Sequence, residues 1–187
     1  MLERHPQIAL LVNNAGIPGR KGFLELEPER LEALIRTNYL GGVWCLRAFV
    51  PGLEAAGRAD VVNIVSVAGT VAFPPSGPYS ASKHAQLAFS RATAGELRPR
   101  GIRVHTINPG LVETEGFPQR GVLAGPLART VIEPEDVALR VVRAIERNRI
   151  ESFVPAWYRA FAIVQALAPG LTARLGGRSR YGRAGKA

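Results

Sequence analysis

Tyrosine and lysine stand four residues apart in the stretch Tyr79-Ser80-Ala81-Ser82-Lys83, and together they could move a proton. The apolar pattern that follows predicts a helix from Tyr79 to about Leu97, and residues four apart share a helix face. A phenol with its usual pKa of about 10 exchanges protons poorly at neutral pH, whereas a neighbouring ammonium lowers that pKa. The spacing therefore favours general acid–base chemistry by Tyr79, tuned by Lys83. The plainer interpretation is two surface residues that happen to share a face.

Two further polar residues could complete such a site. The β-branched run from Val61 to Val65 predicts a short buried strand that ends at Ser66. Ligands of open α/β sheets bind beyond the carboxyl ends of the strands, so the Ser66 hydroxyl could hold a substrate oxygen. Asn38 lies inside a predicted helix although asparagine is a poor helix former, and such conflict often marks a functional position. A serine that begins a turn and a kink tolerated by packing are the alternatives.

Two more strands must position these residues. The unbroken apolar run from Ile8 to Val12 predicts a parallel strand buried on both faces, and it ends in Asn13, Asn14, Ala15 and Gly16. A third predicted strand, residues 103–108, runs into Pro109 and Gly110. Three strands thus end in small or polar residues at what would be one edge of a sheet, where a ligand could approach the backbone.

In their order and spacing, these motifs resemble the short-chain dehydrogenase/reductase family over about residues 5–155. The resemblance implies an α/β fold, a partial Rossmann-like doubly wound parallel sheet of about four strands, with NAD or NADP as cofactor. It implies that Tyr79 acts as general acid/base and that Lys83 lowers the Tyr79 pKa and holds the nicotinamide ribose. Ser66 would hold the substrate oxygen, and Asn38 would position a water that relays protons to Lys83.

The same resemblance implies a set of cofactor contacts beyond the four catalytic positions. Besides Tyr79 and Lys83 they are Asn14, Ala15, Gly16, Pro109, Gly110, Val112 and Thr114. The family chooses between NAD and NADP in a part of the sheet that this sequence does not contain. The choice of nucleotide is therefore not predicted.

The sequence departs from the family pattern at its beginning. No glycine-rich loop precedes Asn13, and Gly16-Ile17-Pro18-Gly19 lacks the G-x-G-x-x-G spacing. We therefore expect an N-terminally shortened member, through a late start, a fragment or gene decay, with a compact variant as the alternative. A chain without that loop lacks the usual pyrophosphate site, so we expect it to bind a dinucleotide weakly by itself.

Composition bounds the remaining possibilities. The 187 residues, 47% of them apolar, suit one globular unit. The net charge of +9 comes mostly from residues 143–187, which carry +7, so we expect no nucleic-acid partner. The single Cys45 excludes an internal disulfide and fits a cytoplasmic setting, and its apolar surroundings predict a core position. The three histidines show no ligand spacing, so no metal is expected.

The organisation predicted from these patterns has three parts. Residues 1–155 form the partial Rossmann-like domain, in which irregular residues 115–130 would be a substrate lid. Residues 156–175 form an amphipathic helix with a break at Pro169-Gly170, and residues 176–187 a disordered basic tail. The helix could lie on an anionic membrane, cover an apolar substrate pocket or line a dimer seam.

These expectations combine into one hypothesis about function. The chain is expected to be an oxidoreductase that interconverts a carbonyl and a secondary alcohol, on a lipophilic small molecule, as a homo-oligomer in its full-length form. We expect it in the cytoplasm, with peripheral membrane contact through residues 156–175 as an option. The alternative is a non-catalytic remnant of the family with a scaffold or interaction role.

Overall fold

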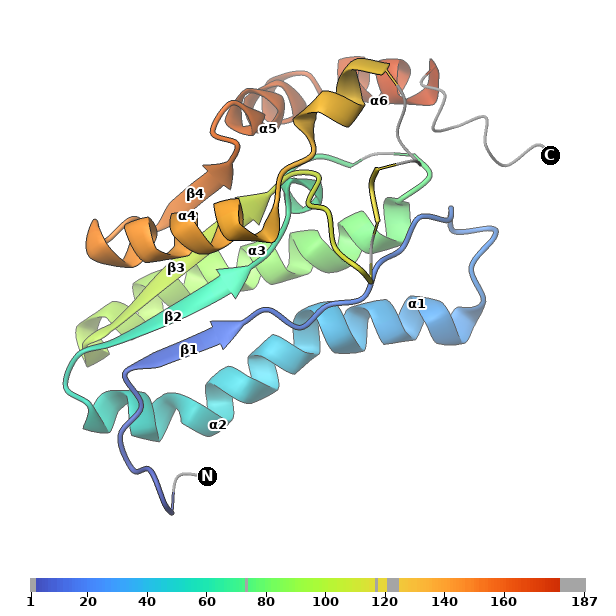
Figure 1. Cartoon of the computed structure of the whole chain (residues 1–187). Helices are drawn as coiled ribbons and strands as arrows, with labels where there is room; N and C mark the ends of the chain where they lie inside the picture. The colour runs from blue at the N-terminus through green and yellow to red at the C-terminus, as the bar shows by residue number, and fades with distance from the viewer. Residues whose placement is uncertain (1–2, 73, 117, 121–124, 179–187) are drawn as a thin grey trace.

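The structure, a computed structural model, describes residues 3–72, 74–116, 118–120 and 125–178. At its centre lies a sheet of four parallel strands that are neighbours in chain order (Figure 1). The strands are β1 (Leu10–Asn13), β2 (Ala59–Ile64), β3 (Ile102–Pro109) and β4 (Glu151–Val154). Parallel strands need crossover connections, and each one here contains helix: α1 (Pro28–Ile35), α2 (Gly41–Ala55), α3 (Gly77–Leu97) and α4 (Pro134–Glu146). The predicted α/β class with about four parallel strands is confirmed.

Helices cover both faces of the central strands. On one face, Val61 of β2 packs in a buried cluster with Leu53 of α2 and Leu97 of α3. On the other face, Val62 packs with Ala144 of α4. Successive side chains of a strand point to opposite faces, so a strand covered on both sides needs an unbroken apolar run. This is why β2 carries apolar residues such as Val61 and Val62 on both faces, while its two polar residues, Asp60 and Asn63, are buried and hydrogen-bonded.

The edge strand β1 is covered on one face only in the part of the chain that the structure describes. Leu11 packs against the cluster shared with α2, whereas Leu10 and Val12 are 47% and 44% exposed. The prediction that this strand is buried on both faces is therefore wrong for the described residues. Its composition is that of a central strand, but β2 is its single partner in the sheet described here.

The helix predicted around Asn38 is present but interrupted. A π-helical turn, Arg36–Leu40, separates α1 from α2, and it contains the buried Asn38. Asparagine is a poor α-helix former, and here it lies in a π-helical turn and not in a regular α-helix. Such turns are frequent at functional sites. In α2 the buried positions include Leu46 and Leu53, and Cys45 is exposed. The prediction that Cys45 lies in the core is wrong, because α2 buries a different stripe.

Helix α3 begins two residues before Tyr79 and ends at Leu97, where a short 3₁₀ turn and Gly101 with φ +76° stop it. The left-handed backbone at Gly101 suits glycine, and the added Cβ of any other residue would lie 2.7 Å from the Gly57 carbonyl oxygen. The face of α3 against the sheet is largely polar, with buried Ser80, Ser82, Lys83, Gln86, Ser90 and Thr93.

The C-terminal region forms two helices, α5 (Tyr158–Leu167) and α6 (Pro169–Arg178), which meet at Ala168. The break predicted at Pro169-Gly170 therefore occurs, and helix continues to Arg178, into the first residues of the predicted tail. Residues 179–187 of that tail lie outside the described residues. In the predicted lid, residues 121–124 lie outside them as well, and Gly125–Thr130 form a 3₁₀ turn. Among the described helices, none combines the length and apolarity needed to cross a bilayer.

Candidate active site

The carboxyl ends of the parallel strands bring the predicted site residues to one edge of the sheet. Strand β1 ends at Asn13, β2 is followed by Ser66, and β3 ends at Pro109. The first turns of α3, with Tyr79 and Lys83, pack beside the short turn that follows Ser66. This is the edge at which open α/β sheets bind ligands.

Tyr79 and Ser66 form the first pair at this edge. The Ser66 Oγ accepts a hydrogen bond from the Ala68 backbone N–H at 3.1 Å, which leaves its own proton to donate. A side-chain hydrogen bond from Ser66 to the phenol oxygen favours the phenolate, but burial is the larger effect and raises the Tyr79 pKa above 10.0. Tyr79 is therefore a neutral phenol at pH 7 in this structure.

Lys83 is buried beside the same edge. Its Nζ donates to the Ile64 carbonyl oxygen at 3.2 Å and to the Gln86 Oε1 at 2.8 Å. Burial lowers the Lys83 pKa from 10.5 to about 8. Lys83 is not among the groups that shift the Tyr79 pKa. Burial is therefore the dominant effect on the phenol, and the lowering of the Tyr79 pKa by Lys83 stays a prediction.

Asn38 joins three segments of the site. Its Oδ1 accepts from the Ile17 backbone N–H at 2.7 Å, and its Nδ2 donates to the Ile17 carbonyl and to the Ser82 Oγ. Ser82 in turn donates to the Tyr79 carbonyl oxygen at 2.7 Å. The amide of Asn38 therefore fixes the loop after β1 against the first turn of α3. These contacts are structural, and the water-positioning role stays a prediction.

The exposed turn after β1 lies against Lys83 and Asn38. A Cβ added to Gly16 would lie 3.3 Å from the Asn38 Oδ1 and 3.6 Å from the Lys83 Nζ. Asn14 and Ala15 are exposed beside it. Glycine at position 16 places no side chain against the Lys83 ammonium, which has three donors, of which two are used. The residues present thus fit a hydroxyl-bearing ligand such as a nucleotide ribose.

The turn after β3 is held from the C-terminal side. The Gly110 backbone N–H donates to the Val154 carbonyl oxygen at 2.8 Å, and a Cβ on Gly110 would lie 2.2 Å from the Tyr158 ring. Val112 pairs with Ile132 in an isolated bridge, and Thr114 is exposed. Glycine is required here because the Tyr158 ring occupies the place of its side chain. The predicted cofactor residues of this turn therefore lie at the same edge as Ser66, next to α5.

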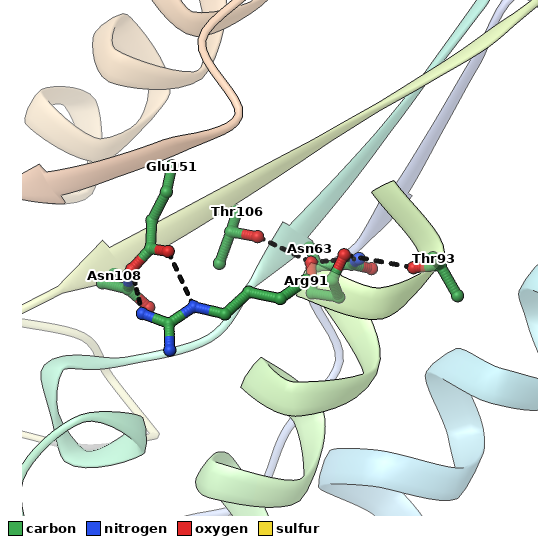
Figure 2. Close-up of polar contacts among 7 residues, drawn as sticks. Asn63, Arg91, Thr93, Thr106, Asn108 and Glu151 are labelled. Atoms are coloured by element: carbon green, nitrogen blue, oxygen red, sulfur yellow. Dashed lines mark hydrogen bonds and ion pairs between the residues drawn. The ribbon is translucent and has the colours of Figure 1, made fainter. Parts of the chain in front are cut away.

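Sequence reasoning missed a polar layer that supports the site from beneath. Asn13 donates to Asn63, Asn63 to the Ser90 Oγ, and Ser90 shares a 2.7 Å hydrogen bond with Thr106. Figure 2 shows Asn63 and Thr106 of this layer beside a second cluster, in which Glu151 accepts hydrogen bonds from Arg91 and Asn108. The signal was present in the sequence, because the polar residues of α3 recur at three- and four-residue spacing.

Fold and site together define a Rossmann-like α/β protein with a polar, partly buried carboxyl edge. A family model for short chain dehydrogenases matches residues 1–121. The chain belongs to the short chain dehydrogenase family.

Individual relatives agree with this assignment. Dehydrogenase/reductase SDR family member 7B of Xenopus tropicalis is 33% identical over 171 residues, covering 87% of this chain and 55% of the relative. The 1-deoxy-11-beta-hydroxypentalenate dehydrogenase of Streptomyces exfoliatus is 35% identical over 149 residues, covering 78% and 54%. The chain thus spans about half the length of the curated relatives it matches.

Solved structures show the same fold. A short chain dehydrogenase from Burkholderia cenocepacia J2315 in complex with NADP superposes with a TM-score of 0.80 at 31% identity, covering 92% of this chain and 70% of that one. A short chain dehydrogenase from Mycobacterium paratuberculosis bound to NAD superposes with a TM-score of 0.66 at 28% identity, covering 75% and 58%.

Proposed function

We propose that this chain carries the catalytic half of an NAD(P)-dependent oxidoreductase that interconverts a carbonyl and a secondary alcohol. The observation that carries the proposal is the placement of Ser66, after β2, and of Tyr79 and the buried Lys83, on the first turns of α3, at the carboxyl edge of a parallel sheet. Family membership supports it, since the chain matches a short chain dehydrogenase model over residues 1–121.

The site residues take distinct roles in the reaction. A nicotinamide dinucleotide would supply or accept the hydride at the carbonyl carbon. Tyr79, a neutral phenol at pH 7, gives its proton to the carbonyl oxygen during reduction and takes it back during oxidation. Ser66 donates a hydrogen bond to the same oxygen once the substrate replaces its contact with Tyr79. Lys83 supplies a buried positive charge that stabilises the phenolate as it forms.

The cofactor would lie along the residues that frame Lys83. Asn14, Ala15 and Gly16 provide an open backbone edge beside the ammonium, and the Pro109-Gly110 turn, with Val112 and Thr114, provides the opposite side. Structural neighbours carry NADP in one case and NAD in another. The cofactor is therefore one of these two dinucleotides, and the residues described here do not choose between them.

The residues of this edge would contact the nicotinamide half of such a cofactor, and the given sequence contains no G-x-G-x-x-G loop for the pyrophosphate. Several hydrogen bonds to a charged group, each worth about 1.5–3 kcal/mol, are then missing. We expect the chain by itself to bind NADH and NADPH at least about 10³-fold more weakly than a complete site would. Fluorescence titration of the purified chain measures this, and a dissociation constant in the low micromolar range would contradict it.

The substrate proposed for this site is lipophilic. Tyr158 places the start of α5 directly on the Pro109-Gly110 turn, and its ring stacks on Trp157 with centroids 4.1 Å apart. The Phe161 ring packs edge-on against Trp157 and completes this aromatic cluster beside the Pro109-Gly110 turn. Glu113, in the segment after β3, accepts hydrogen bonds from the backbone of Gln119 and Arg120, which ties part of the predicted lid to this segment.

A second proposal concerns contacts of the C-terminal helices. Trp157, Ile163 and Leu167 are 46%, 50% and 81% exposed, and residues 143–187 carry a charge of +7. An apolar surface beside arginines suits an anionic membrane, and the same surface suits a dimer seam. Flotation with anionic vesicles, with and without residues 156–187, separates the two. Equal flotation of both forms removes the membrane contact. A cytoplasmic location and a homo-oligomer stay predictions.

The experiment for the main proposal follows the hydride itself. The encoded protein, with any residues that precede Met1 in the same reading frame, is incubated with dideuterated NADH or NADPH and a panel of ketones and aldehydes of increasing bulk. We expect an alcohol that carries one deuterium on the former carbonyl carbon, detected by mass spectrometry. An alcohol without deuterium would contradict the proposal, and so would full activity of a Ser66→Ala, Lys83→Met double variant.

A further inference from the structure

Gln86 has a position in the site that neither the motif nor the proposed reaction explains. It follows Lys83 by three residues on α3, and both side chains are 4% exposed. Burying an amide is costly unless its polar atoms are paired. The Gln86 Oε1 accepts a 2.8 Å hydrogen bond from the Lys83 Nζ. A buried amide oxygen is thus directed at the buried ammonium.

The direction of this contact matters. Side chains on a helix lean toward its N-terminus, so Lys83 would by default extend toward Tyr79 one turn earlier. Instead, its Nζ bonds the Ile64 carbonyl oxygen of β2 and the Gln86 amide on the C-terminal side. The groups that the structure places around the ammonium are Gln86 on its own helix, the Ile64 carbonyl of β2 and Gly16 across the edge, and Tyr79 lies one turn earlier on the same helix. Tyr79 is the titratable one among them.

We propose that Gln86 is a positioning residue for Lys83, whose amide oxygen holds the buried ammonium charged and aims its remaining N–H at the open side next to Gly16. This inference rests on the proposed function for its meaning in catalysis. The physical claim about Lys83 stands on the geometry alone.

The sequence of α3 supports a dedicated role for Gln86. Helix positions before and after it on the same face are filled by groups with other partners: Ser82 bonds the Asn38 amide, and Ser90 bonds Asn63 and Thr106. Thr93, drawn in Figure 2, is the next buried polar residue of the helix, and its hydroxyl bonds back to the carbonyl oxygens of Phe89 and Ser90 on the same helix. Gln86 is the member of the stripe that contacts the ammonium. An apolar side chain of similar size would fill the space and leave the charge with one acceptor.

The chain offers a direct readout, because it contains three lysines, at positions 21, 83 and 186. The chain is labelled with lysine carrying ¹³C at Cε, and each Cε signal is followed by NMR from pH 6 to 10.5. A Lys83→Arg variant, which lacks one signal, assigns the resonance. Burial places the Lys83 pKa at about 8 in the unsubstituted chain, so its titration falls inside this window.

Gln86→Leu should increase the Lys83 acid dissociation constant tenfold or more, a fall of at least about one pKa unit, because a hydrogen bond to the ammonium is lost. Gln86→Glu should shift the midpoint in the opposite direction, because a carboxylate favours the charged form. Ser80→Ala is the matched control, since Ser80 is buried on the same helix and its Oγ has no hydrogen-bond partner. It should leave the Lys83 midpoint unchanged.

Two results would overturn the proposal. One is a Lys83 midpoint in Gln86→Leu that matches the unsubstituted chain. The other is a Gln86→Glu midpoint that does not rise, and this result decides the matter alone if Gln86→Leu does not fold. The NMR measurement needs no turnover, so it can support or contradict the role of Gln86 even if the deuterium-transfer experiment fails. Conversely, a Lys83 midpoint that the Gln86 substitutions leave unchanged would contradict the role of Gln86 but not the proposed reaction.

Discussion

The two ends of the sheet bury charged groups in opposite ways. Toward the amino end, Asp60 accepts hydrogen bonds from Arg103 at 2.7 Å and from the His105 Nε2 at 2.8 Å, while the His105 Nδ1 faces the Arg149 carbonyl. At the carboxyl end, Lys83 is buried as well, but among the residues that the structure describes its partners are two neutral acceptors, with no carboxylate.

The difference appears in the pKa values. Burial alone would raise the Asp60 pKa, but hydrogen bonds from Arg103 and His105 outweigh it and leave the pKa below 3.8. At the carboxyl end burial wins, so the Tyr79 pKa rises and the Lys83 pKa falls to about 8. A buried charge that is paired with an opposite charge serves the fold, whereas a buried charge without an opposite charge beside it is a candidate for binding a ligand. By this criterion Asp60 belongs to a structural cluster and Lys83 to a functional site.

The largest effect on the free energy of unfolding is expected from removing the Asp60 carboxylate, which pairs with Arg103 and His105. Asp60→Asn leaves Arg103 and the fully buried His105 without their carboxylate, and breaking a buried pair typically costs about 3–5 kcal/mol. Urea unfolding at pH 7 measures this loss. Glu96→Gln, an exposed acid on α3, is the control and should change stability by less than about 0.5 kcal/mol. A loss below about 1 kcal/mol in Asp60→Asn would contradict the structural role.

The pH dependence of this cluster has a definite sign. A carboxyl whose folded-state pKa lies below 3.8 contributes stability above that value and loses it as the pH falls through the folded pKa. Acid unfolding of the unsubstituted chain should therefore steepen below about pH 4, and the Asp60→Asn variant should lack that component.

A smaller effect, of opposite direction, is expected at the carboxyl end. Lys83→Met removes a buried charge whose pKa is 10.5 when unfolded and about 8 when folded. That difference corresponds to at most about 3 kcal/mol of destabilisation at pH 7, part of which offsets the loss of the Gln86 and Ile64 contacts. We expect Lys83→Met to be more stable by about 1–2 kcal/mol at pH 7, while its activity falls.

The sign of that effect can be checked by pH. Between pH 8 and 10.5 the folded protein binds fewer protons at Lys83 than the unfolded chain, so its stability rises with pH. The advantage of Lys83→Met should shrink over this interval and disappear above it. An Lys83→Met variant that is less stable than the unsubstituted chain at every pH would show that the ammonium is structurally satisfied, as Asp60 is.

The same contrast explains how far the sequence could predict the molecule. The strand ends were readable because apolar runs stop at Asn13 and Ser66, and parallel strands bring those ends to one edge. The irregular helix at Asn38 was also indicated, because asparagine is a poor helix former. Each of these features depends on residues that are neighbours in the chain, so one sequence is enough to predict it.

Features that depend on distant partners could not be read. The exposure of Leu10 and Val12 depends on what covers β1, and the exposure of Cys45 depends on which stripe of α2 meets the sheet. The direction of the Tyr79 pKa depends on burial, which competes with the charge that the four-residue spacing suggests. The Gln86 contact was also missed, since a glutamine on a helix gives no sign of its partner.

Tyr79 is proposed as the proton donor of this edge, and removal of its hydroxyl is the sharpest test of that role. In Tyr79→Phe the ring and its packing remain while the proton and the Ser66 contact are lost. With Ser80→Ala as control, turnover is measured by deuterium transfer to a carbonyl substrate. We predict a loss of about 10²-fold or more in Tyr79→Phe and less than about threefold in Ser80→Ala. Turnover of Tyr79→Phe within tenfold of the unsubstituted protein would contradict the account.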